Sequence, residues 1–210
     1  MSRSWHFDVI MSLGLIACMS GTLIGEAAHE WLGTVVLVLF VWHFWQHRRW
    51  FAMLNRGRYH ANRVLGTLFN GGLCFTTLGL CASSIMLSQV VFAFLPLHLP
   101  QGTGLTPHQI CAAWGFLWAA LHLGQHTGIF LRRFSVFYRY KRIFTVFVAA
   151  FAVWAIGQGD FLRLLFLQQQ GLAPDADLLT VTFADGILFL AFTLLGAALH
   201  HALNHRKEKL

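Results

Sequence analysis

The chain is poor in charge, proline and cysteine. Only 11% of its 210 residues are charged, and it holds 4 prolines and 4 cysteines. Soluble domains average about 25% charged residues. The composition excludes a disordered, collagen-like or acidic-tail protein. The net charge of +7 does not indicate nucleic-acid binding, because the basic residues form short clusters beside apolar runs.

The cysteines and glycines form no motif for a metal or a nucleotide. Cys18, Cys74, Cys81 and Cys111 all lie in apolar runs, without a Cys-x-x-Cys or Cys-x-x-Cys-His pattern. This excludes a zinc ribbon, a thioredoxin-type motif and a covalently attached c-type haem. No nucleotide-binding fingerprint is present, so a flavin or NAD domain would have to belong to another protein.

Hydrophobic residues are abundant, at 57%, and the mean hydropathy is +0.60. A membrane-spanning helix needs about 20 mostly apolar residues. The sequence therefore predicts an all-α polytopic membrane protein, a single domain over 1–210 with six transmembrane helices. The predicted spans are 8–26, 29–50, 64–95, 108–131, 143–159 and 179–203. Residues 96–107 are predicted to be a turn-rich loop, and 160–170 an amphipathic interfacial segment. Thr106 and Pro107 are typical of a helix start.

All but one of the 15 basic residues lie at the termini or in alternate connections, 48–63 and 132–142. The other connections contain acidic residues, with Arg163 as their single base. Short basic connections face the cytoplasm in most membrane proteins. We therefore expect a bacterial inner-membrane protein with the N- and C-termini in the cytoplasm.

Many of the 12 histidines follow a repeat. The same spacing separates His29 from His43 and His108 from His122, and the pattern His-x13-His-x2-Gln-His occurs twice, ending at His47 and His126. The preceding spans share a Cys-x-Ser echo at Cys18 and Cys81. The sequence therefore predicts a duplicated helix pair over 8–50 and 70–131 within residues 1–131, followed by an additional helix pair and a cytoplasmic tail over 132–210.

The histidine spacing is close to four helical turns, so both imidazoles of a helix share one face, about 21 Å apart along the axis. The second and fourth spans are expected to run parallel, which puts His29 level with His108 and His43 level with His122. Two facing imidazoles at each level can hold a flat macrocycle, as in bis-histidine ligation of b-type haem. Gly33 and Gly115 are compatible with a porphyrin close to the backbone.

These features resemble the four-helix di-haem cytochrome b superfamily, which includes ferric-reductase-type transmembrane domains. The likeness is stronger to a small bacterial cytochrome-b-like membrane family of unknown function. It is carried by His29–Gly33 with His43, Arg48–Phe51, Asn70–Ser88, His108 and Leu121–His126. The resemblance implies two non-covalent b haems, membrane electron transfer, and ligands at His29 and His108 for an outer haem and at His43 and His122 for an inner haem.

Two assignments stay open at this point. His47 and His126 lie five whole turns from His29 and His108, so helix phase alone does not exclude them as ligands. Otherwise they would meet haem propionates or lipid headgroups. Arg48, Arg49 and Arg63 could pair with inner propionates or act as ordinary membrane anchors.

Two functions fit these residues. The first is a di-haem electron conduit in the lipid bilayer, linking a quinone pool or a cytoplasmic donor to a periplasmic flavin, multihaem or molybdenum protein. The second is a histidine-based metal-ion transporter or sensor that uses the pairs His43/His47 and His122/His126, since two imidazoles one turn apart make half of a zinc or copper site.

Overall fold

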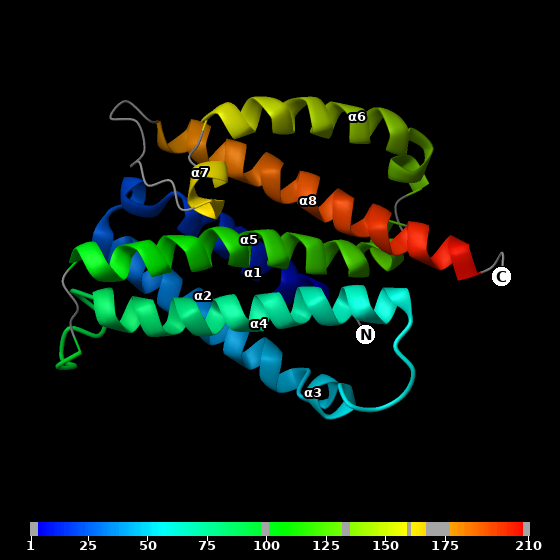
Figure 1. The fold of residues 1–210 in the computed structure, drawn as a ribbon. Coiled ribbons are helices and arrows are strands. Elements are labelled where there is room, and N and C mark those ends of the chain that lie inside the picture. Colours follow the sequence, from blue (N-terminus) through cyan, green and yellow to red (C-terminus); the bar gives the residue numbers. More distant parts are fainter. Residues whose placement is uncertain (1–3, 98–100, 132–134, 159–160, 167–176, 208–210) are drawn as a thin grey trace.

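The computed structural model describes residues 4–97, 101–131, 135–158, 161–166 and 177–207, and every regular element in these ranges is a helix (Figure 1). The elements are α1 (Ser4–Met19), the 3-10 helix η1 (Gly21–Ile24), α2 (Glu26–Gln46), α3 (Arg49–Met53), α4 (Ala61–Leu87), α5 (Gln101–Leu131), α6 (Ser135–Gln158), α7 (Phe161–Leu165) and α8 (Leu178–Lys207). The predicted all-α class is confirmed for these residues.

Within these ranges, three helices are long and apolar enough to cross a membrane: Glu26–Gln46, Ala61–Leu87 and Leu178–Asn204. The apolar parts of α1 and α6, His6–Met19 and Ile143–Gly157, are shorter. Large hydrophobic side chains such as Phe75 and Leu179 lie on the outside, 75% and 77% exposed. An apolar exterior of this kind suits lipid rather than water as the solvent.

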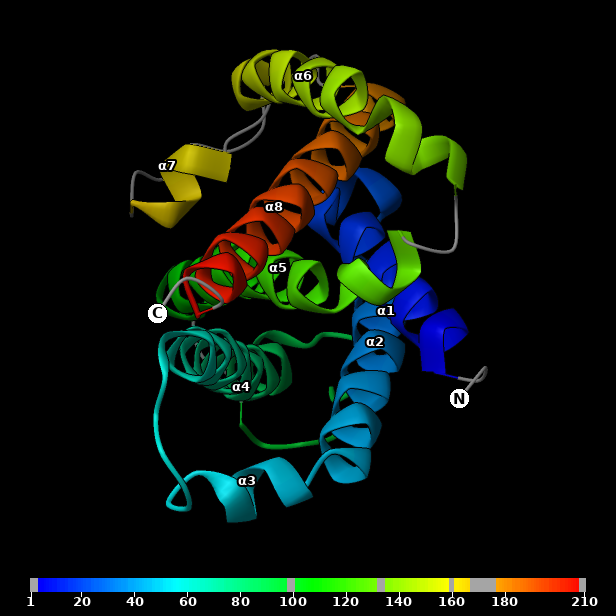
Figure 2. The ribbon, with the colours of Figure 1, turned by 90° about the vertical axis from the view of Figure 1, so that its right-hand side faces the viewer.

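The helices form a bundle around α5. Helix α4 lies along one side of α5 and α8 along another, and α6 covers the outer side of α8 (Figure 1). Helix α1 contacts α2, α5 and α8. Helix α1 begins and α8 ends at the same end of the bundle, the end where α3 lies. Figure 2 shows α2 standing away from α4 and α5 at this end, with α1 beside it.

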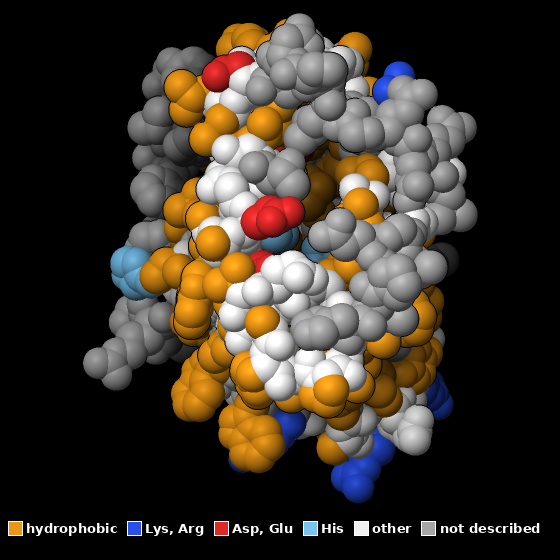
Figure 3. Space-filling view, turned by 90° about the vertical axis from the view of Figure 1, so that its left-hand side faces the viewer, with side chains coloured by type: hydrophobic (Ala, Val, Ile, Leu, Met, Phe, Trp, Pro, Cys, Tyr) orange, Lys and Arg blue, Asp and Glu red, His pale blue; other side chains and the backbone are white. Residues whose placement is uncertain are grey.

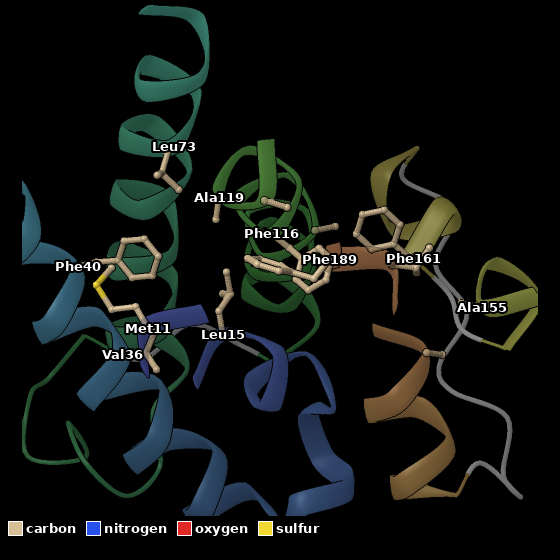
Figure 4. Close-up of a cluster of buried hydrophobic side chains, with 14 residues drawn as sticks. Met11, Leu15, Val36, Phe40, Leu73, Phe116, Ala119, Ala155, Phe161 and Phe189 are labelled. Carbon is tan, nitrogen blue, oxygen red and sulfur yellow. The ribbon is translucent and has the colours of Figure 1, made fainter. Parts of the chain in front are cut away.

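The buried core combines side chains from α1, α2, α4, α5, α6, α7 and α8 (Figure 4). Phe116 of α5 is fully buried, and its ring centroid is 5.4 Å from that of Phe161 in α7 and 5.2 Å from that of Phe189 in α8. Met11, Leu15, Val36 and Phe40 form the part of the core contributed by α1 and α2. This apolar layer fixes how α2 and α5 face each other.

Helices α5 and α8 approach closely at two glycines. A Cβ atom at Gly124 would meet the backbone of Thr193, and one at Gly196 would meet the carbonyl oxygen of Leu121. Small residues allow such close backbone contact between membrane helices. The extra helices 132–210 are therefore joined to the first part of the chain by direct α5–α8 packing.

The predicted boundaries around residues 88–107 were wrong. Helix α4 ends at Leu87, not at residue 95, because Ser88 is extended (φ −62°, ψ 130°) and residues 88–91 wrap around the Glu30 carboxylate. Hydropathy could not show this, since residues 90–95 are as apolar as the helix before them. Helix α5 begins at Gln101, so Pro107 lies inside it and Thr106 is not its cap. The proline removes one backbone hydrogen bond near the helix start.

The segment predicted to lie at the membrane interface is partly built into the core. Phe161 in α7 is only 3% exposed and packs on Phe116 and Phe192. The indole Nε1–H of Trp114 donates to the carbonyl of Leu165 over 3.2 Å. Asp160 and residues 167–170 of the predicted segment lie outside the described residues.

Replacing Gly124 tests the α5–α8 contact. We expect Gly124→Ala to lower the free energy of unfolding by about 1–3 kcal/mol, because the added methyl would overpack a backbone contact. Thermal unfolding in detergent measures this. Gly186→Ala in α8 is the matched control, because no heavy atom lies within 4 Å of a Cβ placed there. Equal melting temperatures for the two variants would contradict the close approach.

Candidate functional site

Two pairs of histidines face each other between α2 and α5. The ring centroids of His29 and His108 are 6.1 Å apart, with ring planes at 73°. Those of His43 and His122 are 6.3 Å apart, at 88°. Helices α2 and α5 therefore run in the same direction, and the structure brings together the histidines that the repeat placed at the same level.

The imidazoles bridge a separation between the two helices. The backbone of α2 packs closely against α1 but makes at most marginal contact with α5. All four side chains are half-buried. Figure 3, which looks at the end where α2 begins, shows histidine side chains partly covered by an acidic side chain.

The ring separations fit two imidazoles on one metal. A bond from an imidazole nitrogen to a first-row metal is about 2.0 Å long. The nitrogen lies roughly 1.1 Å from the centre of a five-membered ring with bonds near the C–N length. Two rings on opposite sides of one metal therefore have centroids about 6.2 Å apart. Both observed separations are close to this value, so the centroid spacing of each pair is compatible with two imidazoles on one metal.

Gly33 and Gly115, which the sequence analysis found compatible with a nearby porphyrin, differ in their surroundings. No heavy atom lies within 4 Å of a Cβ placed on Gly33, one turn after His29, so this position is open. A Cβ on Gly115 would lie 3.3 Å from Oγ1 of Thr76 on α4. Gly115 is thus an α4–α5 packing position, and Gly33 alone of the two remains compatible with a flat group beside the backbone.

At the inner level, both rings have an oxygen near Nδ1. Nδ1 of His122 is 2.6 Å from Oδ1 of Asn70 on α4. Because an amide oxygen can only accept, Nδ1 carries the proton and Nε2 keeps its lone pair. Nδ1 of His43 lies 3.8 Å from the Asp8 carboxylate of α1, and Phe7 stacks on its ring at 6.4 Å.

At the outer level, only one ring has such a contact. Nδ1 of His108 is 3.2 Å from Oγ of Ser83 and 3.4 Å from Oγ of Ser84. The Ser83 hydroxyl donates to the carbonyl of Gly79 over 2.8 Å, so its oxygen is left to accept from His108. Nδ1 of His29 is buried and has no hydrogen-bond partner in the described part of the chain.

Glu30, next to His29, binds the segment that follows α4. One carboxylate oxygen accepts from Oγ of Ser88 at 2.6 Å and from the amides of Val90 and Val91 at 3.0 Å, and the other accepts from the amide of Gln89 at 2.7 Å. Four donors on one carboxylate make a strong, charge-assisted clasp. It ties the end of α4 to the first turn of α2 at the outer histidine level.

His47 and His126, the alternative ligands, do not face each other between α2 and α5 as the four paired histidines do. His47 and His126 pack on His43 and His122 with centroids 4.6 Å and 4.8 Å apart. Both side chains are exposed, unlike those of the four paired histidines. Among the described residues, no group of three or more His, Cys, Asp or Glu side chains is arranged to hold a metal ion.

Of the arginines proposed to bind propionates, Arg48 and Arg49 are exposed and Arg63 is half-buried. The guanidinium of Arg48 donates to the carbonyl of Trp45 over 3.0 Å and lies over the Trp45 ring. That of Arg63 donates to carbonyls of the connection before α4 and lies 4.3 Å from the ring centroid of Tyr59. These two side chains stabilise the α2–α4 connection. Within the described part of the chain, Arg49 makes no side-chain hydrogen bond of this kind.

The sequence did not single out Asn70, Asp8, Ser83 or Glu30 as site residues. One signal existed for Ser83, the echo of Cys18-Met-Ser20 in Cys81-Ala-Ser83. The structure shows that the echo is imperfect, since Ser20 bonds Oγ1 of Thr182 at 2.6 Å and no histidine. The other three contacts depend on which faces of α1, α2 and α4 meet, which no local pattern reveals.

No family model matches the sequence, and no curated protein and no solved structure matches the chain.

The clasp is tested by removing its carboxylate. We expect Glu30→Ala to speed amide hydrogen exchange at Gln89, Val90 and Val91 by about tenfold or more, because hydrogen bonds to a charged acceptor are worth about 1.5–3 kcal/mol. Exchange followed by mass spectrometry measures this. Glu26→Ala, in the same helical turn but exposed, is the control. Unchanged exchange in Glu30→Ala would show that other contacts hold residues 88–91.

Proposed function

We propose that the protein is a di-haem b-type membrane cytochrome. It carries electrons between a quinone pool or a cytoplasmic donor and a periplasmic redox partner such as a flavin, multihaem or molybdenum protein. It would thus serve as the electron-transfer subunit or partner of an oxidoreductase. The observation that supports this most is the matching separation of two histidine pairs, 6.1 Å and 6.3 Å, at the value for two imidazoles on one iron.

The chain's own residues have distinct tasks in this proposal. His29 and His108 hold the outer haem, and His43 and His122 the inner one, in each case through Nε2. The haem, when bound, takes up and releases single electrons. The amide oxygen of Asn70 and the hydroxyl of Ser83 keep the proton on Nδ1 of the α5 ligands, so Nε2 stays free for the metal.

The apolar layer between the two levels has a part in this function. Val36 and Phe40 of α2 and Phe116 of α5 are buried between the outer and inner histidines. A layer of low dielectric excludes water from the space between the sites and holds the two ligand helices in register. The ligand spacing along each helix is about 21 Å, so the two sites lie near opposite faces of a bilayer of about 30 Å.

The proposed topology is six spans in a bacterial inner membrane with both termini cytoplasmic. Two observations support it. Helix α1 begins and α8 ends at one end of the bundle, together with α3 and its arginine-rich connection (Figure 1). The opposite end has Glu26, Glu30 and Asp177 at helix starts. The inner histidine pair then lies toward the cytoplasm and the outer pair toward the periplasm.

A histidine-based metal-ion transporter or sensor is the second candidate. The close ring pairs His43–His47 and His122–His126 favour it. It leaves the outer pair without a role, and in the ranges that the structure describes no group of three or more His, Cys, Asp or Glu side chains is arranged to hold one metal ion.

Haem content tests the proposal. A pyridine haemochrome assay on the purified protein should approach two b-type haems per chain, all of them extracted by acidified acetone. We expect His43→Ala or His122→Ala to lose one haem and retain most of the other, and His29→Ala or His108→Ala to lose the other one. His47→Ala and His126→Ala are the matched controls, one turn away, and should keep both.

A colourless protein that binds zinc or copper would refute the cytochrome and support the second candidate. Loss of a haem in His47→Ala, with both retained in His43→Ala, would assign the inner ligands to the other histidines.

The ring orientations give a spectroscopic prediction. Interplanar angles of 73° and 88° are far from parallel. Nearly perpendicular imidazoles leave two iron d orbitals almost equal in energy, so the ferric haems should give strongly anisotropic low-spin EPR signals at low field. Low-temperature EPR of the oxidised protein measures this. Ordinary rhombic spectra, typical of parallel imidazoles, would contradict the observed geometry.

A further inference from the structure

The two histidine levels differ in the oxygen atoms that lie near Nδ1, the imidazole nitrogen that is not proposed to bind iron. At the inner level, His122 has an amide oxygen at 2.6 Å and His43 a carboxylate at 3.8 Å. At the outer level, His108 has hydroxyl oxygens at 3.2 and 3.4 Å, and Nδ1 of His29 has no partner. The inner rings therefore have the shorter contact and the nearer negative charge.

An acceptor on Nδ1 changes the metal bond on the other side of the ring. It draws the Nδ1 proton toward itself and makes Nε2 a stronger electron donor. A stronger donor stabilises the ferric more than the ferrous iron and lowers the reduction potential of the haem. A nearby carboxylate acts in the same direction by its charge. Both effects are larger at the inner level.

The outer level also has a carboxylate nearby, that of Glu30, but its two oxygens already accept four hydrogen bonds from residues 88–91. These donors offset much of its negative charge. Among the described residues Asp8 has no comparable set of donors, and its side chain is 36% exposed. The uncompensated carboxylate is therefore the inner one.

Positive charges at the cytoplasmic end act in the opposite direction. Arg48 and Arg49 are exposed, Arg63 is half-buried, and the guanidinium groups of Arg48 and Arg63 donate to backbone carbonyls. Exposed charges are screened by salt within about 8 Å at physiological ionic strength. The direct contacts on the imidazoles should therefore decide which haem has the lower reduction potential.

Asn70 is well placed to hold its position. It lies on α4 next to Phe69 and one turn before Leu73 and Cys74, and Phe69 and Leu73 are only 3% and 5% exposed. An amide oxygen on a packed helix can keep one short hydrogen bond in place. Its counterpart at the outer level, Ser83, sits on the same helix but offers a longer and weaker contact.

On the basis of the proposed function, we infer that Asn70 is a positioning residue for His122, and that Asn70 and Asp8 make the inner haem the lower-potential one. Transfer of one electron from the inner to the outer haem, with ferrous iron oxidised at one and ferric iron reduced at the other, is then favourable. The internal equilibrium draws electrons toward the periplasmic end.

Redox titration of the full-length, haem-loaded protein tests this. We expect Asn70→Leu, which has a similar size but no acceptor, to change the ferric/ferrous ratio of the lower-potential haem about tenfold in favour of ferrous iron, a rise of about 59 mV for a one-electron couple. The higher midpoint should not move. Asp8→Asn should raise the same lower midpoint.

The matched control is Asn62→Leu, on the same helix but bonded to Asn204 at the cytoplasmic end. It should shift neither midpoint. Ser83→Ala should raise only the higher midpoint, by less than Asn70→Leu raises the lower. This pattern of selective shifts is not expected of a residue that merely stabilises the fold.

Movement of the higher midpoint in Asn70→Leu and Asp8→Asn would reverse the order of the two haems and overturn the inference, as would no movement in either. If Asn70→Leu fails to retain haem, Asp8→Asn at its more exposed position decides alone. A wild-type protein without haem would overturn the proposed function itself, whereas two haems with unresponsive midpoints would overturn only this inference.

Discussion

The separation of α2 from α5 is the constraint on which the candidate site depends. The two helices are close enough for imidazoles to face each other at 6.1 and 6.3 Å, yet their backbones hardly meet. Ordinary helix packing brings axes to within 8–10 Å and fills the space with interlocking side chains. Here α2 is held by α1, which also contacts α5, and by the Glu30 clasp at its first turn. A helix supported in this way can leave its inner face to a ligand.

Packing in the rest of the bundle holds α4 and α5 in place around these contacts. Helix α5 is embedded between α4, α8 and α7, with Phe116 fully buried at its centre. The glycine contacts with α8 hold its second half. Helix α4 then presents Asn70 and Ser83 to the two α5 histidines from a fixed position. One side of the site is thus a helix packed on three neighbours, and the other is a less buried helix tied at its first turn.

Much of this could be predicted from the sequence, because it depends on regular helical spacing. The repeat of His29 and His43 in His108 and His122 predicted which rings share a level, and the structure places those rings opposite each other. The exit of α4 at Ser88 could not be predicted, because a carboxylate distant in sequence takes the amides that would have continued the helix. Asn70 was missed for a related reason. A single asparagine in an apolar helix has no periodicity, and its role becomes visible only when α4 is placed beside His122.

The most direct test of the central claim is an experimental density map of the protein purified with its native cofactor. The account predicts planar density centred between His29 and His108 and again between His43 and His122, with the ring centroids still about 6.2 Å apart. Histidine rings in direct contact without density between them, or a single compact ion bound by His43, His47, His122 and His126, would contradict it.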